Sequence, residues 1–155
     1  PKVLRSVFSG NITTDWISQV EANAVFLILR DTAFTSDEAF LEWARQDLLR
    51  LFQRASYRML MFVMSPSLVA LGTAKRWKQF HKGSDIVADP VKRNEGRLGT
   101  NIRLSYPVGL FPDLQLVRQG EAFKIALSCA KAKDVQCLHH KQSPTESVYA
   151  VSWDA

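Results

Sequence analysis

The residues of this sequence that could carry out chemistry are a cysteine and two histidines near the C-terminus. Cys137 and His139 are two positions apart, so on a β-strand both side chains lie on one face. A thiolate and an imidazole in that arrangement could bind a metal ion, with His140 beside them and His81 as the remaining histidine. The spacing supplies no third and fourth ligand, so we expect ordinary strand side chains and no metal site. A Cys–His catalytic pair is less favoured still, because no third group orients the histidine.

Motifs for phosphate binding or hydrolysis are absent from the sequence. There is no Gly-x-Gly-x-x-Gly or Walker-type loop, no Gly-x-Ser-x-Gly elbow and no His-Glu-x-x-His. Gly96 and Gly99 precede a predicted strand, which is the wrong context for a phosphate loop. We therefore predict that the protein is not an enzyme and that it has no cofactor.

The positive charge of the chain is concentrated in its middle third. The net charge is +5, and residues 51–103 contain ten basic and three acidic side chains, whereas residues 104–155 contain five of each. A solvated surface is the simplest interpretation of such an excess. An anionic partner is the alternative: nucleic acid (the least expected), acidic lipid or an acidic protein surface. The candidate anion-binding residues are Arg76, Lys78, Arg93, Arg97 and Arg103.

The most apolar run covers residues 57–64 and contains all three methionines of the chain. We predict that this run forms a buried helix or helix end. Because methionine adapts to irregular shapes, the run could also line a pocket for an apolar ligand or a groove for a partner helix. Plain core packing is the simpler interpretation. The ligand hypothesis places an apolar cavity between the helices of residues 57–71 and the sheet, near Met59, Met61, Met64 and Phe123.

Four further segments read as helices. The first runs from residue 14 or 15 to about 29. Thr35 and Glu38 match a capping box for a second helix that ends near residue 54. Ser65 and Pro66 are a typical N-cap and first-turn proline for a third helix, which ends near residue 80. The fourth opens at Pro112 and ends near residue 131, with Gly120 as a close-packing point. The predicted apolar face of the first helix consists of Trp16, Val20, Ala24 and Leu27.

Three strands are expected in the second half of the chain. Residues 98–106 alternate between apolar and polar types, as a half-buried strand does. Residues 135–139 and 147–153 read as two more strands, joined by a loop over residues 141–145. Helices followed by strand, helix and two strands indicate an α+β fold. We expect N-terminal helices packed on a small antiparallel sheet, with a further helix between strands.

The length and composition favour one globular domain. The chain has 155 residues, of which 46% are hydrophobic, so we expect residues 1–155 to form a single domain with residues 1–13 as a possible N-terminal arm. The start at Pro1 suits a processed form or a fragment of a longer protein. No apolar run approaches the roughly 20 residues of a membrane-spanning helix. The two cysteines are too few for a disulfide framework, which predicts reduced thiols and a cytoplasmic protein.

From about residue 40 to residue 153 the pattern resembles a family of uncharacterised domains that is abundant in myxobacteria. The positions that carry the resemblance are apolar and turn-forming residues, so the resemblance implies a shared fold more than a shared chemical activity. They include Arg76-Trp77, Gly96-Arg97-Leu98, Leu104-Ser105-Tyr106-Pro107, Gly109-Leu110, Lys133-Asp134-Val135 and Tyr149-Ala150-Val151-Ser152-Trp153.

More distantly, the layout is similar to haem-based nitric oxide and oxygen sensor domains, to 4-vinyl-reductase-type small-ligand domains and to vesicle-tethering subunits. This resemblance implies helices packed on an antiparallel sheet, with an apolar ligand between the layers in several members. The haem sensors carry a histidine before the sheet and a Tyr-x-Ser-x-Arg signature. His81 is in roughly that region, but after Tyr106 the chain reads Pro107-Val108-Gly109-Leu110 and lacks the serine and arginine.

These observations favour a non-catalytic accessory or signalling module that binds a protein partner, a second copy of itself or an apolar small ligand. An anion-directed adaptor that uses the basic middle third is one alternative. A haem- or metal-based sensor is the other.

Overall fold

The computed structural model describes residues 18–154, which form helices and an antiparallel sheet as the sequence predicted. Residues 1–13, proposed as an arm, and Trp16 lie outside the described residues. The described helices are α2 (Gln19–Ala33), α3 (Asp37–Gln53), α4 (Ala55–Val63), α5 (Pro66–Phe80) and α6 (Asp113–Cys129). The described strands are β1 (Asp85–Ala88), β2 (Lys92–Asn94), β3 (Arg97–Ser105), β4 (Gln136–Ser143) and β5 (Glu146–Asp154). The predicted α+β class is confirmed.

The sheet has the strand order β1-β3-β5-β4, with β2 paired to β3, and all pairs are antiparallel. The alternation predicted for residues 98–106 is confirmed, because Thr100, Ile102 and Leu104 are buried while Asn101 is exposed. The short strands β1 and β2 were not predicted, since they lie in a segment rich in glycine, proline and polar residues. The predicted loop over residues 141–145 was too long, because β4 continues through a bulge to Ser143.

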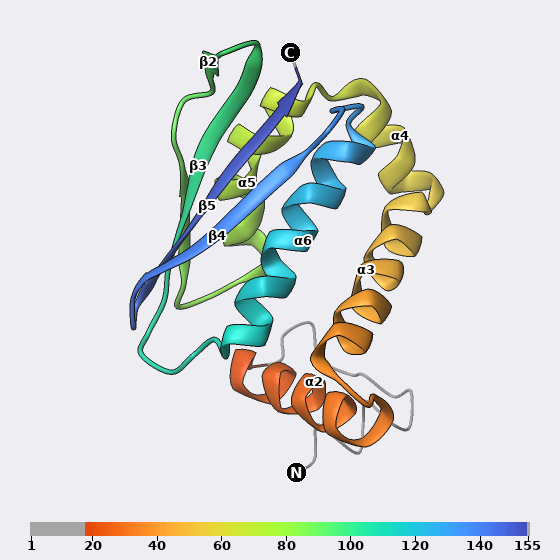
Figure 1. Cartoon of the computed structure of the whole chain (residues 1–155), viewed down its shortest axis with the longest axis vertical. Coiled ribbons are helices and arrows are strands. Elements are labelled where there is room, and N and C mark those ends of the chain that lie inside the picture. The colour runs from red at the N-terminus through yellow and green to blue at the C-terminus, as the bar shows by residue number, and fades with distance from the viewer. Residues whose placement is uncertain (1–17, 155) are drawn as a thin grey trace.

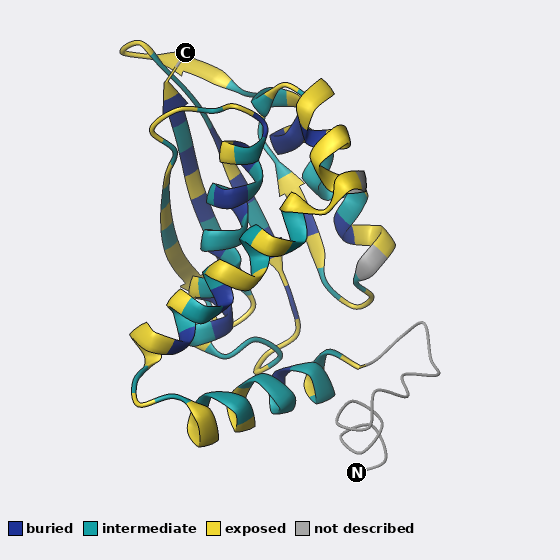
Figure 2. Cartoon of the chain, turned by 90° about the vertical axis from the view of Figure 1, so that its right-hand side faces the viewer, coloured by how far each residue is buried: buried dark blue, intermediate teal, exposed yellow. Residues whose placement is uncertain are grey.

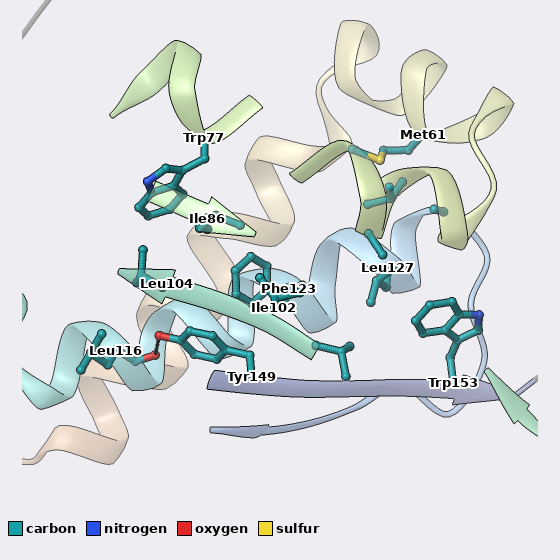
Figure 3. Close-up of a cluster of buried hydrophobic side chains, with 14 of the residues drawn as sticks. Met61, Trp77, Ile86, Ile102, Leu104, Leu116, Phe123, Leu127, Tyr149 and Trp153 are labelled. Carbon is teal, nitrogen blue, oxygen red and sulfur yellow. Dashed lines mark hydrogen bonds between the residues drawn. The ribbon is translucent and has the colours of Figure 1, made fainter. Parts of the chain in front are cut away.

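One face of the sheet is covered by α5 and α6, and α3 packs on the far side of α6, while the other face of the sheet carries no helix (Figure 1). The core lies between the sheet and these helices (Figure 3). Trp153, Tyr149 and Ile102 contribute from the strands, and Leu116 and Leu127 from α6; each is at most 2% exposed. The described residues thus share one core that fixes α6 against the sheet.

Serine side chains begin three of the helices. Ser65 accepts a hydrogen bond from the Leu68 amide at 3.3 Å, with Pro66 in the first turn, as predicted. The capping box proposed for Thr35 was wrong by one residue: Ser36 is the N-cap and accepts a hydrogen bond from the Ala39 amide at 3.2 Å. Both residues are competent caps, and the choice depends on where the chain turns into α3.

Helix α2 crosses the lower end of the molecule and is mostly half-buried (Figure 2). It begins at Gln19, later than the sequence suggested, and the face proposed for it was wrong because Val20 and Leu27 are exposed. Its buried residue is Asn23, whose side-chain amide donates a hydrogen bond to the carbonyl of Leu110. A polar contact, rather than an apolar stripe, therefore anchors α2 to the loop before α6.

The prediction of a buried helix over residues 57–64 was also wrong. Helix α4 forms there, but only Met61 is buried, whereas Met59 is 72% exposed and Val63 is 74% exposed. The run is apolar on nearly all sides, and the main contacts of α4 are with α3 and α6. A helix that meets two neighbours along one narrow stripe leaves its remaining apolar residues in solvent.

Candidate functional site

The metal-like group predicted from the sequence does not converge. Cys137 and His139 share one face of β4, as predicted, but His81 lies at the end of α5 and stacks on Trp77. Within residues 18–154 no three histidine, cysteine or acidic side chains are placed to hold a metal ion. Burial raises the pKa of the Cys137 thiol to about 12, so the thiol is protonated at neutral pH and is a poor nucleophile.

His139 instead belongs to a buried polar cluster between β4, β5 and the end of β3. Its Nε2 atom lies 3.2 Å from the Ser147 hydroxyl, which is 3.0 Å from the Tyr106 hydroxyl. Ser147 is 0% exposed, so the cluster is closed to a substrate. The ring of His139 stacks on Tyr149, whose hydroxyl donates to the Leu116 carbonyl at 3.0 Å. These contacts satisfy polar groups inside the core and tie α6 to the sheet.

The four residues proposed for an apolar pocket lie in different surroundings. Met61 and Phe123 are buried in the core, and Met64 packs against it (Figure 3). Met59 points into solvent. Met59 therefore does not share a cavity with the other three.

The proposed anion-binding residues are spread over α5, β2 and β3, and three of them have acidic partners. Lys78 lies 3.5 Å from Asp85, and Arg103 lies 2.6 Å from Asp89. The remaining side chains have other surroundings: Arg76 donates to the Met64 sulfur at 2.8 Å, and Arg93 is exposed on β2.

Arg97 ties together two segments that follow α6. Its guanidinium donates to the carboxylates of Asp134 and Asp154, both at 2.7 Å, and to the Asp134 carbonyl at 2.6 Å. These contacts join β3 to the loop before β4 and to the end of β5. Much of the charge of this residue is thus used inside the chain.

Helices α4 and α5 present a group of exposed apolar side chains, which we call the α4–α5 apolar face. Its members are Met59, Leu60, Phe62, Val63, Leu68 and Leu71. A two-residue link, Met64 and Ser65, joins the two helices. The surroundings are basic: Arg54 and Arg58 are exposed at the start of α4, and the Lys131 ammonium lies 4.0 Å from the centre of the Phe62 ring. Soluble monomers rarely expose apolar side chains in such a group.

A small cavity of about 50 Å³ lies where α2, β3 and the facing parts of α5 and α6 meet. Trp77 and Phe111 form part of its apolar wall, and His81 and Arg118 contribute its titratable groups. Phe26 of α2 closes another side, so the docking of α2 through Asn23 completes the enclosure. His81 and Arg118 come from different helices, and only the fold brings them together.

His81 is held at the end of α5 by its own backbone and by Trp77. Its amide donates to the Trp77 carbonyl at 2.8 Å, and the two rings stack with centres 3.6 Å apart and an angle of 9° between them. The Trp77 indole N–H donates to the Ser84 hydroxyl at 3.1 Å, which fixes the tryptophan. Burial lowers the pKa of His81, so the imidazole is neutral at pH 7.

Arg118 is the functional residue that sequence reasoning missed. The spacing suggests a pair with Glu121, but Glu121 pairs with Lys124 at 2.9 Å. The Arg118 guanidinium instead lies over the Phe26 ring, with its carbon 4.3 Å from the ring centre. Its Nε is buried without a hydrogen-bond partner among the described residues, and burial lowers the pKa of the group. The sequence alone does not show which basic side chain lacks an acidic partner in the folded structure.

Comparison with known proteins gives a structural neighbour and no sequence family. No family model matches the chain, and no curated protein matches it. A solved structure described as "Probing the function of heme distortion in the H-NOX family" is similar with a TM-score of 0.51 and 12% sequence identity. The match covers 90% of this chain and 73% of that chain. The likeness shows a shared fold. It agrees with the distant resemblance seen in the sequence, whereas the myxobacterial resemblance stays a prediction.

The residues of this chain do not fit a haem. The cavity beside His81 has a volume of about 50 Å³, which has room for a few water molecules and is far less than a porphyrin needs. Trp77 covers one face of the His81 ring at 3.6 Å. The chain also turns from Tyr106 into Pro107 and Gly109 without the serine and arginine of the haem-sensor signature. We therefore assign no step to this cofactor.

Proposed function

We propose that this protein is a non-catalytic interaction module that binds a partner protein through the α4–α5 apolar face. The observation that carries the proposal is the exposure of large apolar side chains on a short helix, with Val63 at 74% and Phe62 at 68%. Burying such side chains against a partner contributes about 25 cal/mol per Å² of apolar area. Flexible methionine and aromatic residues are frequent at interfaces of this kind.

The charge around the face indicates what the partner presents. The first turn of α4 has no acidic residue, and Arg54, Arg58 and Lys131 surround the apolar side chains. Two copies that met through this face about a two-fold axis would bring like charges together, which disfavours a symmetric dimer. A different chain with an apolar patch flanked by carboxylates complements the face in both shape and charge.

Two observations on the described residues motivate the non-catalytic part of the proposal. The described His139–Ser147 pair is closed to solvent at Ser147, and the Cys137 thiol is protonated at neutral pH. The proposal includes a signalling role, because the chain shares its fold with a structure from the H-NOX family. In this chain the face on α4 and α5 is the surface through which we expect that contact.

Binding of a defined peptide tests the proposal. The probe is a synthetic amphipathic helix with leucines on one face and glutamates along its edges, labelled for fluorescence anisotropy. We expect it to bind, and we expect Met59→Glu or Val63→Glu to weaken binding by about tenfold or more, because each places a carboxylate in the contact. A peptide with lysines in place of the glutamates should bind far more weakly.

Leu138→Glu is the matched control, because Leu138 on β4 is 73% exposed and lies outside the α4–α5 apolar face. It should bind the acidic peptide as the unaltered protein does. Equal losses in all three variants would overturn the proposal. Photo-crosslinking from position 63 in the native host identifies the class of partner. Adducts only to a second copy of this chain would show self-association instead of binding to a partner protein. Binding only to phosphatidylserine vesicles that depends on the α4–α5 apolar face would show that the face binds a lipid surface.

A further inference from the structure

We propose that the cavity between α2, α5 and α6 is a binding site for a small carboxylate, which the Arg118 guanidinium holds. The site is independent of the α4–α5 apolar face, since α4 contributes none of its lining. It is also distinct from the polar cluster around Ser147.

The first observation is an incomplete set of contacts around the half-buried Arg118 side chain. The Arg118 Nε is buried and donates to no described residue. Its Nη1 has a marginal contact with the Gln115 side-chain oxygen at 3.5 Å, and the group forms no ion pair within residues 18–154. A buried N–H without an acceptor is costly, and a bidentate carboxylate satisfies Nε and a neighbouring amino group together.

The lining of the cavity is the second observation. Gln19, Gln115 and Gln119 contribute amides, His81 contributes a neutral imidazole, and none of the described residues that line the space is acidic. Hydrogen-bond donors without a competing carboxylate suit an anion. Trp77, Leu104, Phe111 and Leu116 line the apolar part, which suits the carbon end of the ligand.

The volume sets the size of the ligand. About 50 Å³ is several times the roughly 10–15 Å³ that a single water needs in a cavity, so the space admits a ligand of a few non-hydrogen atoms. The ligand class is therefore a small monocarboxylate such as formate or acetate.

The internal alternatives to a ligand are two carboxylates nearby. Glu121 is three residues along α6 and is already paired with Lys124. Asp47 on α3 raises the pKa of Arg118 through its charge but forms no ion pair with it, and its side chain is exposed. Neither carboxylate satisfies the buried Nε, so the position is open to a ligand from solution.

An NMR titration with sodium acetate tests the site. Chloride replaces acetate at the start of the titration, so that the ionic strength stays fixed, and acetamide serves as the uncharged analogue. We expect the Arg118 Nε–H and the Trp77 indole N–H to shift saturably with acetate and formate. Acetamide and chloride should leave both signals in place. The melting temperature should rise with acetate over the same range, because the ligand binds only the folded state.

Two variants separate binding from folding. Arg118→Met removes the cation and should weaken acetate binding by about tenfold or more. In acetate-free buffer this variant should melt at or above the temperature of the unaltered protein, because it loses a buried N–H that has no acceptor among the described residues. Lys133→Met removes an exposed cation that lies just after the same helix and outside the cavity, so this variant should keep the acetate response.

Three results would overturn the proposal. An Arg118→Met protein that still shifts the Trp77 signal with acetate would show that the guanidinium does not hold the anion. A response to acetate that appears only in Asp47→Asn would make Asp47 the native partner of Arg118. A Soret band on hemin addition that is lost in His81→Gln would show that the cavity opens for a haem instead.

Discussion

At the scale of single residues, Arg118 and His81 are basic side chains whose pKa values burial lowers, and neither forms an ion pair within residues 18–154. The Glu42 carboxyl, which pairs with Arg45, instead has its pKa lowered to about 2 by hydrogen bonds. Burial disfavours the charged form of a base, and a partner favours the charged form of an acid. We therefore expect proton binding at His81 and anion binding at Arg118 to change the stability of the fold.

Stability should fall with pH below about 6.5 because of His81. Its pKa in the folded state is lower than its ordinary value of 6.5, so the unfolded chain takes up the proton first as the pH falls. The free energy of unfolding is then fully retained above pH 6.5, falls between 6.5 and the lower folded-state pKa, and levels off below it. Urea titrations from pH 8 to 5 in acetate-free buffer measure this slope.

His81→Gln should reduce that slope, although His139, whose pKa burial also lowers, keeps part of it. His140→Gln is the control, since this side chain is exposed on β4. A slope that stays unchanged in His81→Gln, or one that His140→Gln removes, would contradict the assignment.

At the scale of elements, the contact between α6 and the sheet depends on the absence of a side chain at Gly120. A Cβ atom built at this position would lie 3.5 Å from the Cys137 sulfur and 3.5 Å from a Tyr149 ring carbon, which is ordinary van der Waals contact. The space therefore accepts one methyl group and no more. Tyr149 cannot move away freely, because its hydroxyl donates to the Leu116 carbonyl.

Gly120→Ala should leave the free energy of unfolding unchanged or raise it by up to about 1 kcal/mol, because alanine is the better helix former. Gly120→Leu should lower it by about 1–3 kcal/mol through overpacking against Tyr149. Urea denaturation of both variants measures the difference. An alanine variant that loses as much stability as the leucine variant would show that α6 sits closer to the sheet than described.

The elements that the sequence predicted well are those with strong local signals. Pro66 and Pro112 mark the starts of α5 and α6, and the alternation along β3 sets its buried face. The exposed side of α4 could not be predicted. An apolar pattern indicates that burial of the helix is favourable, but it does not show whether another element packs against that side. The site at Arg118 was missed for a related reason: the missing partner is a property of three packed helices and not of spacing.

At the scale of the whole molecule, the helices cover one face of the sheet and leave two kinds of exposed surface. The uncovered face forms an open groove between β2 and β4, with Gly99, Ala150 and Ser152 among its lining. The apolar side chains gather on α4 and the start of α5. No described helix is long and apolar enough to cross a membrane. The protein thus has two exposed surfaces on opposite sides of the fold, a groove on the sheet and an apolar group on the helices.

The positive charge of the middle third is the remaining property of the whole chain, and its distribution disfavours a polyanion as partner. Lys78, Arg97 and Arg103 are paired with acidic side chains, and the candidates are divided between α5, β2 and β3. A protein that makes six to ten phosphate contacts loses about 10³–10⁵ in affinity between 50 and 200 mM salt. We expect duplex DNA to bind this protein weakly and to lose less than about tenfold over that range, because few unpaired cations lie together.

Arg97→Gln and Arg93→Gln distinguish the two roles of the basic side chains. Arg97→Gln should lower the free energy of unfolding, since Asp134 and Asp154 lose their shared partner, and should leave DNA affinity nearly unchanged. Arg93→Gln changes an exposed side chain and should alter neither. A steep salt dependence that both substitutions reduce would reverse this assignment. DNA phosphates would then displace the carboxylates that pair with the arginines of β3, and the uncovered face of the sheet would be the DNA-binding surface.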